Sequence, residues 1–246
     1  MRRVLSKPLR QGDRTMGRHS LPGQPPVALT LRKSARARRI SLRISQLDGR
    51  VTLTYPQAVS ESEAIGFARS KEDWIRQHLG ARPVPASVGF GETLPVEGVP
   101  RRIVPAEGRR VSLHADQVAV PEGAEARRLA RFLKELARDR LTEACDDYAA
   151  MLGRGYSSLT MRDTRSRWGS CSVAGGLMFS WRLILAPPEI LHYVAAHEVA
   201  HLAEMNHSAA FWAQVERLFG PYKAARHWLR DNGAELHRYR FDAPAG

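Results

Sequence analysis

Two histidines and a glutamate lie close together in the segment His197-Glu198-Val199-Ala200-His201. On an α-helix, residues four positions apart share a face about 6 Å apart, so both imidazoles can reach one metal ion. Zinc suits such a pair because it accepts imidazole nitrogen at about 2.0–2.1 Å. Glu198 follows the first histidine by about 100° round the helix. It therefore lies beside the ion, where a general base for an activated water belongs.

His207 is available as a third ligand, six residues after His201. A helix end followed by a turn can return it to the ion, and Asn206 can adopt the left-handed backbone conformation that such a turn can use. Three histidines leave the fourth zinc position open for water, as in catalytic sites. The sequence therefore predicts one zinc ion per chain. Glu198 would take a proton from the water and pass it to the leaving amine.

The alternative interpretation is a surface helix with solvated histidines. The flanking residues argue against it, because they make the segment apolar on almost every face, which is typical of a buried helix. These residues are Val194, Ala195, Val199, Ala200 and Leu202. Buried imidazoles and a buried carboxylate are costly without partners, and a metal ion supplies one. The pattern therefore favours a metal site.

Three stretches around this motif form a recognisable set. They are Arg165-Ser166-Arg167-Trp168-Gly169-Ser170-Cys171-Ser172, then Phe179-Ser180-Trp181-Arg182-Leu183, then His197-Glu198-x-x-His201-Leu202-x-Glu204-x-Asn206-His207-Ser208 with Phe211-Trp212. The set closely resembles the YgjP-like metallopeptidase family, which is related to the SprT and WLM zinc peptidases. The resemblance spans roughly residues 30–240 and is densest over 160–230.

This resemblance implies a zinc-dependent, metallopeptidase-like enzyme with a small antiparallel sheet beside the active-site helix. His197, His201 and His207 would be the ligands and Glu198 the base. The ligand spacing also matches the metzincin proteases. Those have glycine three residues after the second histidine, where this chain has Glu204, so a metzincin turn is not expected.

Candidate substrate contacts lie mostly in the segment before the metal helix. A strand beside a zinc site can bind an extended peptide by adding it to the sheet edge, and we expect residues 177–183 to form that strand. The candidate contacts are Arg165, Trp168, Phe179, Trp181 and Tyr222. Each has a plainer alternative, since an arginine can pair with a structural acid and an aromatic ring can belong to the core.

Several supporting roles near the site remain open between alternatives. Tyr222 and His227 follow the ligands and are candidates for stabilising an oxyanion. Glu204 or Asn206 could hold a ligand histidine in place. Cys171 either approaches the zinc ion or is an inert core residue.

The N-terminal half is expected to be rich in strands. Apolar residues alternate over 27–31, 40–44 and 51–55, and Asp48-Gly49 between the last two is a hairpin signal. Ser60 and Glu63 form a capping box for one helix that ends at Gly80. Residues 83–120 are expected to form short strands and turns.

The C-terminal half changes to a helical period. A helix of about 28 residues is expected from Glu122, followed by strands over 158–162 and 177–184. Pro187-Pro188-Glu189 opens the metal helix, because proline and a carboxylate both suit a first turn. Two more helices are expected, one from Ser208 to Gly220 and one from Pro221 to about Asn232.

These elements predict an α+β protein in four parts. Residues 1–26 would be a disordered basic tail, and 27–120 a strand-rich N-terminal region with one helix. Residues 121–240 would be a compact zincin-like metallopeptidase core, with the H-E-x-x-H helix beside a small antiparallel sheet. Residues 241–246 would be a short tail.

Charge is unevenly distributed over the 246 residues, whose net charge is +13. Residues 1–50 carry a net charge of +11, and the remaining 196 residues carry only +2. This excludes a uniformly basic, histone-like chain. A weak nucleic-acid contact through residues 1–50 is one interpretation, and a solvated basic segment is the other. The run from Arg32 to Arg39 lacks interleaved aromatic residues, which gives base stacking little support.

The remaining composition indicates a globular protein of a reducing compartment. Hydrophobic residues make up 43% of the chain, and no apolar run approaches the about 20 residues of a membrane helix. The start of the sequence lacks the apolar segment of a secretory signal. Two cysteines, Cys145 and Cys171, imply no disulfide framework. We therefore expect a cytoplasmic location and no membrane partner.

The leading functional hypothesis is a zinc metallopeptidase that cleaves a peptide or protein substrate. A second hypothesis is a metal-dependent amidohydrolase that acts on a non-peptide amide. A third, from a different class, is a nucleic-acid-associated zinc protein whose metal site is vestigial or regulatory.

Overall fold

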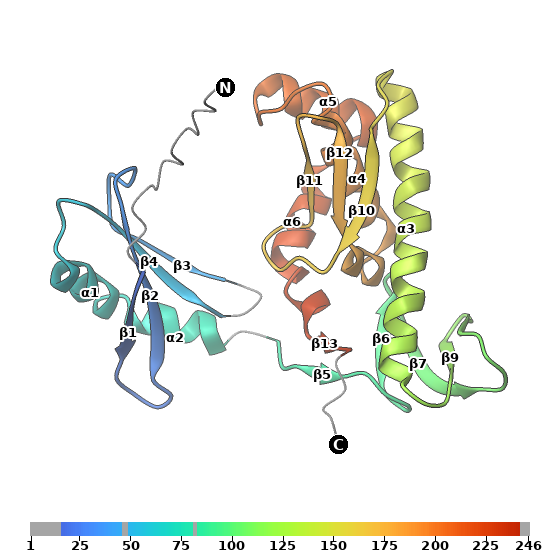
Figure 1. Cartoon of the computed structure of the whole chain (residues 1–246), viewed down its shortest axis with the longest axis horizontal. Coiled ribbons are helices and arrows are strands. Elements are labelled where there is room, and N and C mark those ends of the chain that lie inside the picture. The colour runs from blue at the N-terminus through green and yellow to red at the C-terminus, as the bar shows by residue number, and fades with distance from the viewer. Residues whose placement is uncertain (1–15, 46–48, 81–82, 242–246) are drawn as a thin grey trace, which may run out of the picture. The chain divides into compact units, whose positions relative to one another are not determined.

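The computed structural model describes residues 16–45, 49–80 and 83–241, and all structural statements concern these residues. The chain divides into two compact units, Met1–Arg82 and Pro83–Gly246. Each unit has a separate hydrophobic core. Both combine helices with sheets (Figure 1), which agrees with the α+β prediction.

The first unit is built on a four-stranded sheet. Its strands run in the order β1 (Met16–Leu21), β2 (Val27–Ser34), β4 (Val51–Pro56) and β3 (Ser41–Ile44). β2 and β4 are parallel, and the other neighbours are antiparallel. The pairing of β3 with β4 confirms the predicted hairpin partners, although Asp48 lies outside the described residues.

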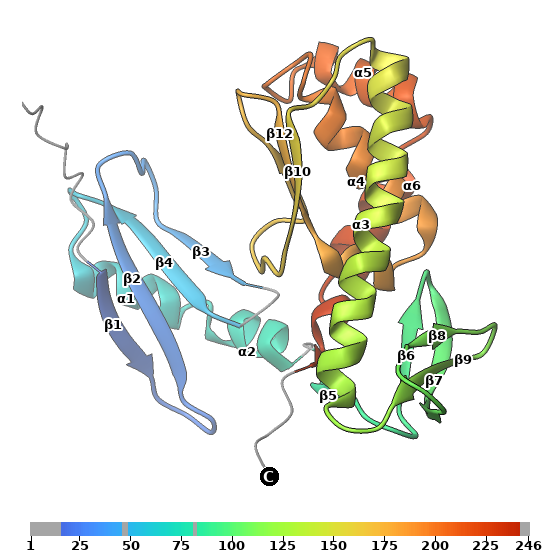
Figure 2. The same cartoon turned by 45° about the vertical axis from the view of Figure 1, so that its right-hand side comes forward.

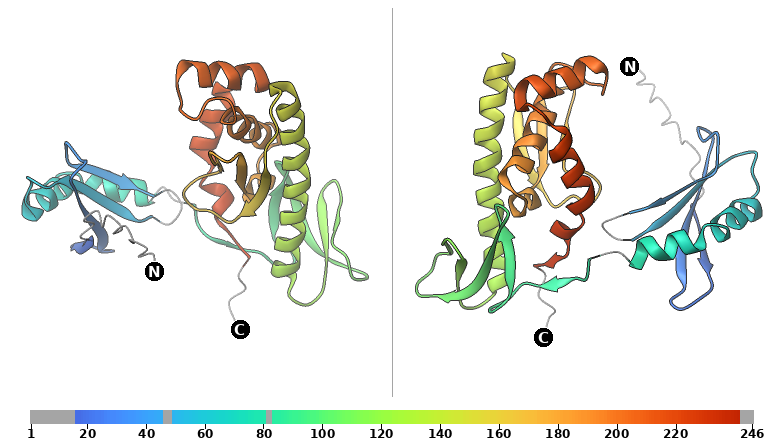
Figure 3. Two further views of the ribbon diagram at one scale, coloured as in Figure 1. Left: turned by 45° about the horizontal axis from the view of Figure 1, so that its top comes forward. Right: turned by 180° about the vertical axis from the view of Figure 1, so that it is seen from behind.

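Two helices cover one face of this sheet, α1 (Glu61–Arg69) and α2 (Glu72–Gly80) (Figure 3). The predicted cap is confirmed, since the Ser60 hydroxyl accepts a hydrogen bond from the Glu63 backbone N–H at 3.1 Å. The sequence predicted one helix here. The structure has two because Ser70 ends α1, where its hydroxyl donates to the Phe67 carbonyl.

The predicted tail over residues 1–26 also differs from the structure. β1 lies inside that range and pairs with β2 along its whole length. Alternate residues of β1 face the core, and Leu21 is fully buried there. This burial offsets the conformational entropy that is lost when a segment rich in basic and small residues becomes ordered. Residues 1–15 and 242–246, the rest of the two predicted tails, lie outside the described residues.

The second unit begins earlier than predicted. A sheet in the order β6 (Thr93–Val96), β7 (Val99–Ala106), β9 (Gln117–Pro121) and β8 (Ser112–Leu113) packs at one end of the long helix α3 (Glu125–Leu152) (Figure 2). Residues of β6, β7 and β9 share one core with α3. The boundary therefore lies near residue 82 instead of 120, because residues 83–120 bury their apolar side chains with the C-terminal half.

The sheet nearest the histidines has three strands, in the order β10 (Ser158–Arg162), β12 (Gly176–Ser180) and β11 (Gly169–Cys171). The predicted sheet was antiparallel, whereas this sheet is mixed. β11 and β12 are antiparallel, but β10 and β12 are parallel. β11 lies between β10 and β12 in the sequence and runs antiparallel to β12, so β12 runs in the same direction as β10.

The strand predicted over 177–184 is also shorter than expected. It ends at Ser180, and the 3₁₀ helix η1 (Trp181–Leu185) follows. β12 is the central strand, hydrogen-bonded on both sides, so residues 177–183 cannot receive an added substrate strand. The free edge next to the metal helix belongs to β11.

The remaining helices confirm the predicted starts and ends. They are α4 (Pro188–Ala200), α5 (Ala209–Phe219) and α6 (Lys223–Asn232). A short 3₁₀ helix η2 (Glu235–His237) leads to β13 (Tyr239–Arg240), which pairs with β5 (Ala86–Ser87). Among the described residues, no helix has the length and apolar character needed to cross a membrane.

Because the cores are separate, a substitution that creates a cavity in one core should lower the stability of that unit alone. Leu53→Ala and Leu133→Ala each truncate a fully buried side chain, one in each core, and each should cost about 2–5 kcal/mol. Hydrogen exchange measured by mass spectrometry should rise in β2 and β4 for Leu53→Ala and in α3 for Leu133→Ala. An equal rise in both units for either variant would contradict two independent cores.

Candidate metal centre

Helix α4 supplies two of the three histidines and is enclosed by protein. It contacts α3, α5, α6 and β11, and nine of its thirteen residues are buried. The predicted burial of this helix is thereby confirmed. α4 ends at Ala200, and His201 follows as its C-cap with helical backbone angles, so the four-residue spacing from His197 still places both rings on one face.

The three predicted ligands meet at one point. One ring nitrogen from each of His197, His201 and His207 lies within 4.8 Å of the other two. The Nε2 atoms of His197 and His207 are 3.1 Å apart. Two ring nitrogens at this distance need a shared proton or cation between their lone pairs. Two nitrogens in a tetrahedral zinc shell would lie about 3.3 Å apart, given the usual zinc–nitrogen distance, so the residues fit a zinc ion.

His207 reaches the other two from the turn between α4 and α5. The Asn206 side-chain oxygen accepts a hydrogen bond from the Ser208 backbone N–H at 3.1 Å. The Ser208 hydroxyl in turn accepts one from the Phe211 backbone N–H, which caps α5. Asn206 therefore shapes the turn and does not hold a ligand histidine. Neither Asn206 nor His207 has positive φ, so the turn does not use the left-handed conformation that Asn206 can adopt.

The two histidines of the α4 end, His197 and His201, are suited to bind as neutral ligands. Burial lowers the pKa of His197 to about 3, helped by repulsion from His201, His207 and Arg226. Burial also lowers the pKa of His201, partly offset by its bond to Glu204. His201 Nδ1–H donates to the Glu204 backbone carbonyl at 3.0 Å, which leaves Nε2 for an ion. The predicted supporting role of Glu204 thus belongs to its backbone, not its carboxylate.

Glu198 is buried beside the histidines, with only 5% of its surface exposed. Burial raises the pKa of its carboxyl to about 8, while the charge of Arg167 and a hydrogen bond from the Cys171 backbone act to lower it. The carboxylate lies against Gly169 of β11. A Cβ atom at Gly169 would come within 2.5 Å of Glu198 Oε1, so only glycine allows this approach.

An aromatic cluster surrounds the histidines. The Phe211 ring lies 4.4–4.9 Å from all three imidazoles. Trp212 lies 5.7 Å from His197 and His207 and stacks on Tyr222 at 4.8 Å. Tyr222, which was predicted as a substrate contact, therefore does not touch a histidine in this stack but is joined to the site by Trp212.

Two residues of this cluster were missed from the sequence. Tyr193 lies 6.0 Å from His197, and the Arg226 guanidinium lies 4.7 Å from the Trp212 ring centre. The sequence could have identified both, because a spacing of four residues places two side chains on one helix face. Tyr193 precedes His197 by four residues, and Arg226 follows Tyr222 by four. His227, the other oxyanion candidate, is exposed, and no contact joins it to the histidines.

The predicted substrate contacts divide into core and surface residues. Phe179 and Trp181 are 0% and 1% exposed, which corrects their assignment, because side chains packed in the core cannot touch a substrate. Trp168 is half-buried and packs on His237 at 4.9 Å. Arg165 is exposed. Burial lowers the pKa of His237 to about 4, and the charges of Arg182 and Arg165 contribute to this. Arg167, and not Arg165, influences Glu198. Burial raises the pKa of the Cys171 thiol, with a smaller contribution from the charge of Glu198.

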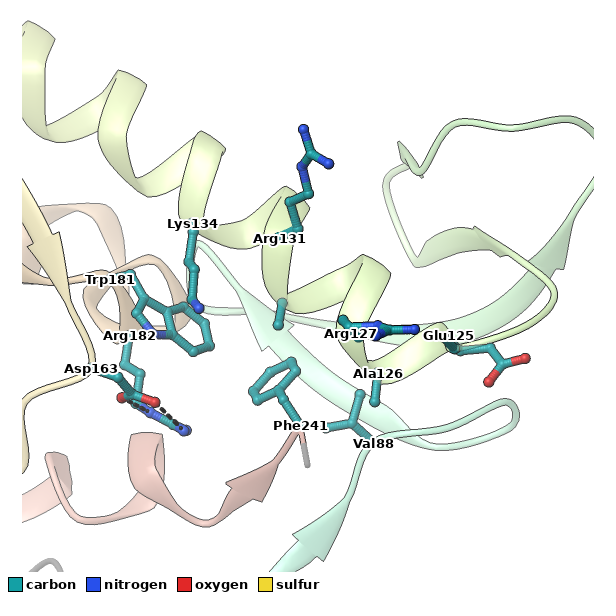
Figure 4. A pocket seen from close by; sticks show the side chains of 12 residues that line it. Val88, Glu125, Ala126, Arg127, Arg131, Lys134, Asp163, Trp181, Arg182 and Phe241 are labelled. Atoms are coloured by element: carbon teal, nitrogen blue, oxygen red, sulfur yellow. Dashed lines mark hydrogen bonds and ion pairs between the residues drawn. The ribbon is translucent and has the colours of Figure 1, made fainter. Parts of the chain in front are cut away.

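Trp181 faces a different part of the unit. It lines a cavity of about 630 Å³ with Lys134, Asp163, Arg182 and Phe241 (Figure 4). Arg182 holds Asp163 through two hydrogen bonds of 2.6 and 3.1 Å. None of the three histidines lines this cavity, so it is separate from the metal centre.

Comparisons with known proteins place these residues in context. A family model described as YgjP-like, metallopeptidase domain, matches residues 38–232. This match confirms the resemblance predicted from the sequence. The crystal structure of the metallopeptidase zymogen of Pyrococcus abyssi abylysin is similar at 22% identity and a TM-score of 0.34, covering 38% of this chain and 92% of that chain. No curated protein matches the chain.

The geometry makes a direct prediction about metal binding. Alanine at His197, His201 or His207 should remove most of the bound divalent metal, measured by elemental analysis of the purified protein, because each loses one of three ligand nitrogens. His192→Ala is the matched control. That histidine lies on the same helix but contacts Tyr148, so metal content should be unchanged. An unchanged metal content in His201→Ala would contradict a metal site at these histidines.

Proposed function

The chain belongs to the YgjP-like metallopeptidase family, and from this premise we propose that it is a zinc-dependent peptidase with Glu198 as its general base. The observation that carries the proposal is the convergence of three histidine nitrogens beside a buried carboxylate. A metal-binding triad without an adjacent acid would support a structural site equally well. The buried acid is what favours hydrolysis.

The three histidines would hold one zinc ion per chain. His201 and His207 contribute one buried and one exposed ring, so the protein encloses the site on one side and leaves the other open to substrate. A zinc ion held there supplies Lewis acidity, which activates water for attack on a carbonyl group. Three protein ligands are the number found in catalytic zinc sites.

Glu198 would move the proton in this reaction. A carboxylate oxygen would accept a proton from the attacking water and return it to the leaving amine nitrogen. Burial raises the pKa of Glu198 to about 8, which by itself favours the protonated form at neutral pH. A nearby cation favours the carboxylate, so binding of the ion and readiness of the base would be coupled.

The outer edge of β11 would bind the substrate main chain. The bonds from Ser180 N–H to the Trp168 carbonyl and from Ser172 N–H to the Gly176 carbonyl face β12. Because antiparallel pairing alternates along a strand, the backbone groups of Gly169 and Cys171 face the other way. The Cys171 N–H already bonds to Glu198 there, so the backbone carbonyl groups are the ones left for a substrate. A peptide added to this edge would pass beside the base. This replaces residues 177–183 as the expected docking strand.

Three of the predicted substrate contacts remain part of the proposal in different roles. Trp168 directly precedes β11, and Arg165 lies in the same exposed loop, so both would meet substrate residues beyond the strand. Tyr222, stacked on Trp212, would line the site beside the histidines that Trp212 contacts.

Replacing the base should separate metal binding from hydrolysis. Glu198→Gln should retain zinc but lower the rate of hydrolysis of an unfolded protein by about 10²–10⁴-fold, the usual contribution of a general base. Glu204→Gln is the matched control, because only the backbone of Glu204 contacts His201, and it should keep full activity. The assay is cleavage of a fluorescently labelled, unfolded protein, with and without DNA.

Other outcomes of this assay would point elsewhere. Equal activity in wild type and Glu198→Gln would remove the general-base role. Hydrolysis of small amides without cleavage of any peptide would favour the amidohydrolase hypothesis. Zinc and DNA binding without hydrolysis of either substrate would favour a zinc protein with a regulatory site.

The contact between Gly169 and Glu198 gives an independent test. Gly169→Ala should displace the Glu198 carboxylate, because the new Cβ atom would overlap it, and a displacement of about 1 Å can lower a rate about 10²-fold. Gly155→Ala is the control, since no atom lies within 4 Å of its Cβ position. Peptidase rate and zinc content are measured together. Loss of zinc in Gly169→Ala would show disruption of the fold instead.

A further inference from the structure

The sheet of the first unit has one face that neither helix of this unit covers. Residues of this open sheet face alternate with the buried ones along each strand. They are Arg18, Ser20, Ala28, Thr30, Arg32, Ser41, Arg43, Thr52 and Thr54. The buried alternates, such as Leu29 and Leu53, pack in the core shared with α1 and α2. The two faces therefore differ completely in chemistry.

The strand register places three arginines on the open sheet face. One row across the four strands reads Arg18, Thr30, Thr52 and Arg43. With strands about 4.8 Å apart, its two arginines are about 14 Å apart at the backbone. Arg32 lies two residues along β2 from Thr30, about 7 Å away. One small anion cannot bridge such a triangle, whereas a polyanion with repeated charges can.

No carboxylate offsets these arginines on the sheet. None of the four strands contains an acidic residue. The acidic residues of this unit within the described ranges all belong to the helices that cover the other face, at Glu61, Glu63, Glu72 and Asp73. Among the described residues, no ion pair involves Arg18, Arg32 or Arg43, and Arg32 Nε is buried without a hydrogen-bond partner.

Two further features extend this charge. The loop between β2 and β3 adds Arg36, Arg38 and Arg39, all exposed. Near Arg18, a hollow of about 450 Å³ lies at the strand ends, where Ala28 and Thr30 line it together with Leu79 of α2. Threonine hydroxyls between the arginines can donate hydrogen bonds to phosphate oxygens.

We propose that the open sheet face binds the phosphodiester backbone of double-stranded nucleic acid. Arginine suits phosphate because its planar guanidinium donates two parallel hydrogen bonds. The open sheet face has no aromatic side chain, since Tyr55 points into the core. Proteins that bind single strands stack bases on aromatic rings, so a backbone contact without base stacking fits this face better. Binding would therefore be independent of sequence and sensitive to salt.

The test measures binding of the full chain to a fluorescent DNA duplex of about 20 base pairs, by anisotropy from about 50 to 200 mM salt. The variant Arg18→Gln, Arg32→Gln, Arg43→Gln should bind at least about 10-fold more weakly. Its salt dependence should also fall, by about 0.9 in the slope of log K against log salt for each phosphate that an arginine no longer neutralises. Circular dichroism checks that the variant is folded.

The matched control removes the same charge from the second unit, at Arg109, Arg110 and Arg138, all exposed and all changed to Gln. This control should bind almost as well as the wild type. A second variant, Thr52→Glu, places one carboxylate in the centre of the open sheet face and should also weaken binding. Arg18→Lys, Arg32→Lys, Arg43→Lys keeps the charge and should retain most of the affinity.

Several results would overturn the proposal. Equal loss of affinity in the sheet variant and the control would mean that net charge alone drives binding. Tighter binding to a single strand than to the duplex would contradict a backbone contact without stacking. Binding to phosphatidylserine vesicles with the same arginine dependence, and none to the duplex, would identify an anionic membrane surface as the partner instead.

Discussion

In the metal centre, Glu198 packs against the backbone of β11, where Gly169 leaves no side chain between them. This contact fixes the separation of the sheet from α4. It also excludes water from the carboxylate, which raises its pKa, and it brings the Cys171 N–H within hydrogen-bonding range. The free edge of the sheet and the base are therefore held as one assembly, and the histidines on α4 take their position from the same packing.

Local chemistry explains which parts of this arrangement could be predicted. Some features depend only on residues close together in the chain and could therefore be predicted. They are the Ser60 and Ser208 caps, the proline start of α4 and the spacing of the three histidines. Contacts between residues distant in sequence could not be predicted in this way. The parallel pairing of β10 with β12 and the contact between Gly169 and Glu198 depend on how the chain returns to itself, and no local period records that.

The errors of prediction share this cause. Phe179 and Trp181 are part of a motif, but a motif does not state which side of a strand or helix faces the core. Both are buried, because they face the core that this part of the chain shares with α3 and α4. The segment 16–21 has no apolar period of its own, and it becomes a strand by pairing with β2. In each case tertiary packing decided what composition left open.

The origin of the third histidine has a consequence for the fold. His197 and His201 belong to the end of α4, whereas His207 belongs to the turn that leads into α5. An ion bound by all three would cross-link that helix end to the turn, as a disulfide joins two segments. Metal affinity and the order of the turn would then be thermodynamically linked. A substitution that stiffens the turn in its metal-binding conformation would tighten metal binding without touching a ligand.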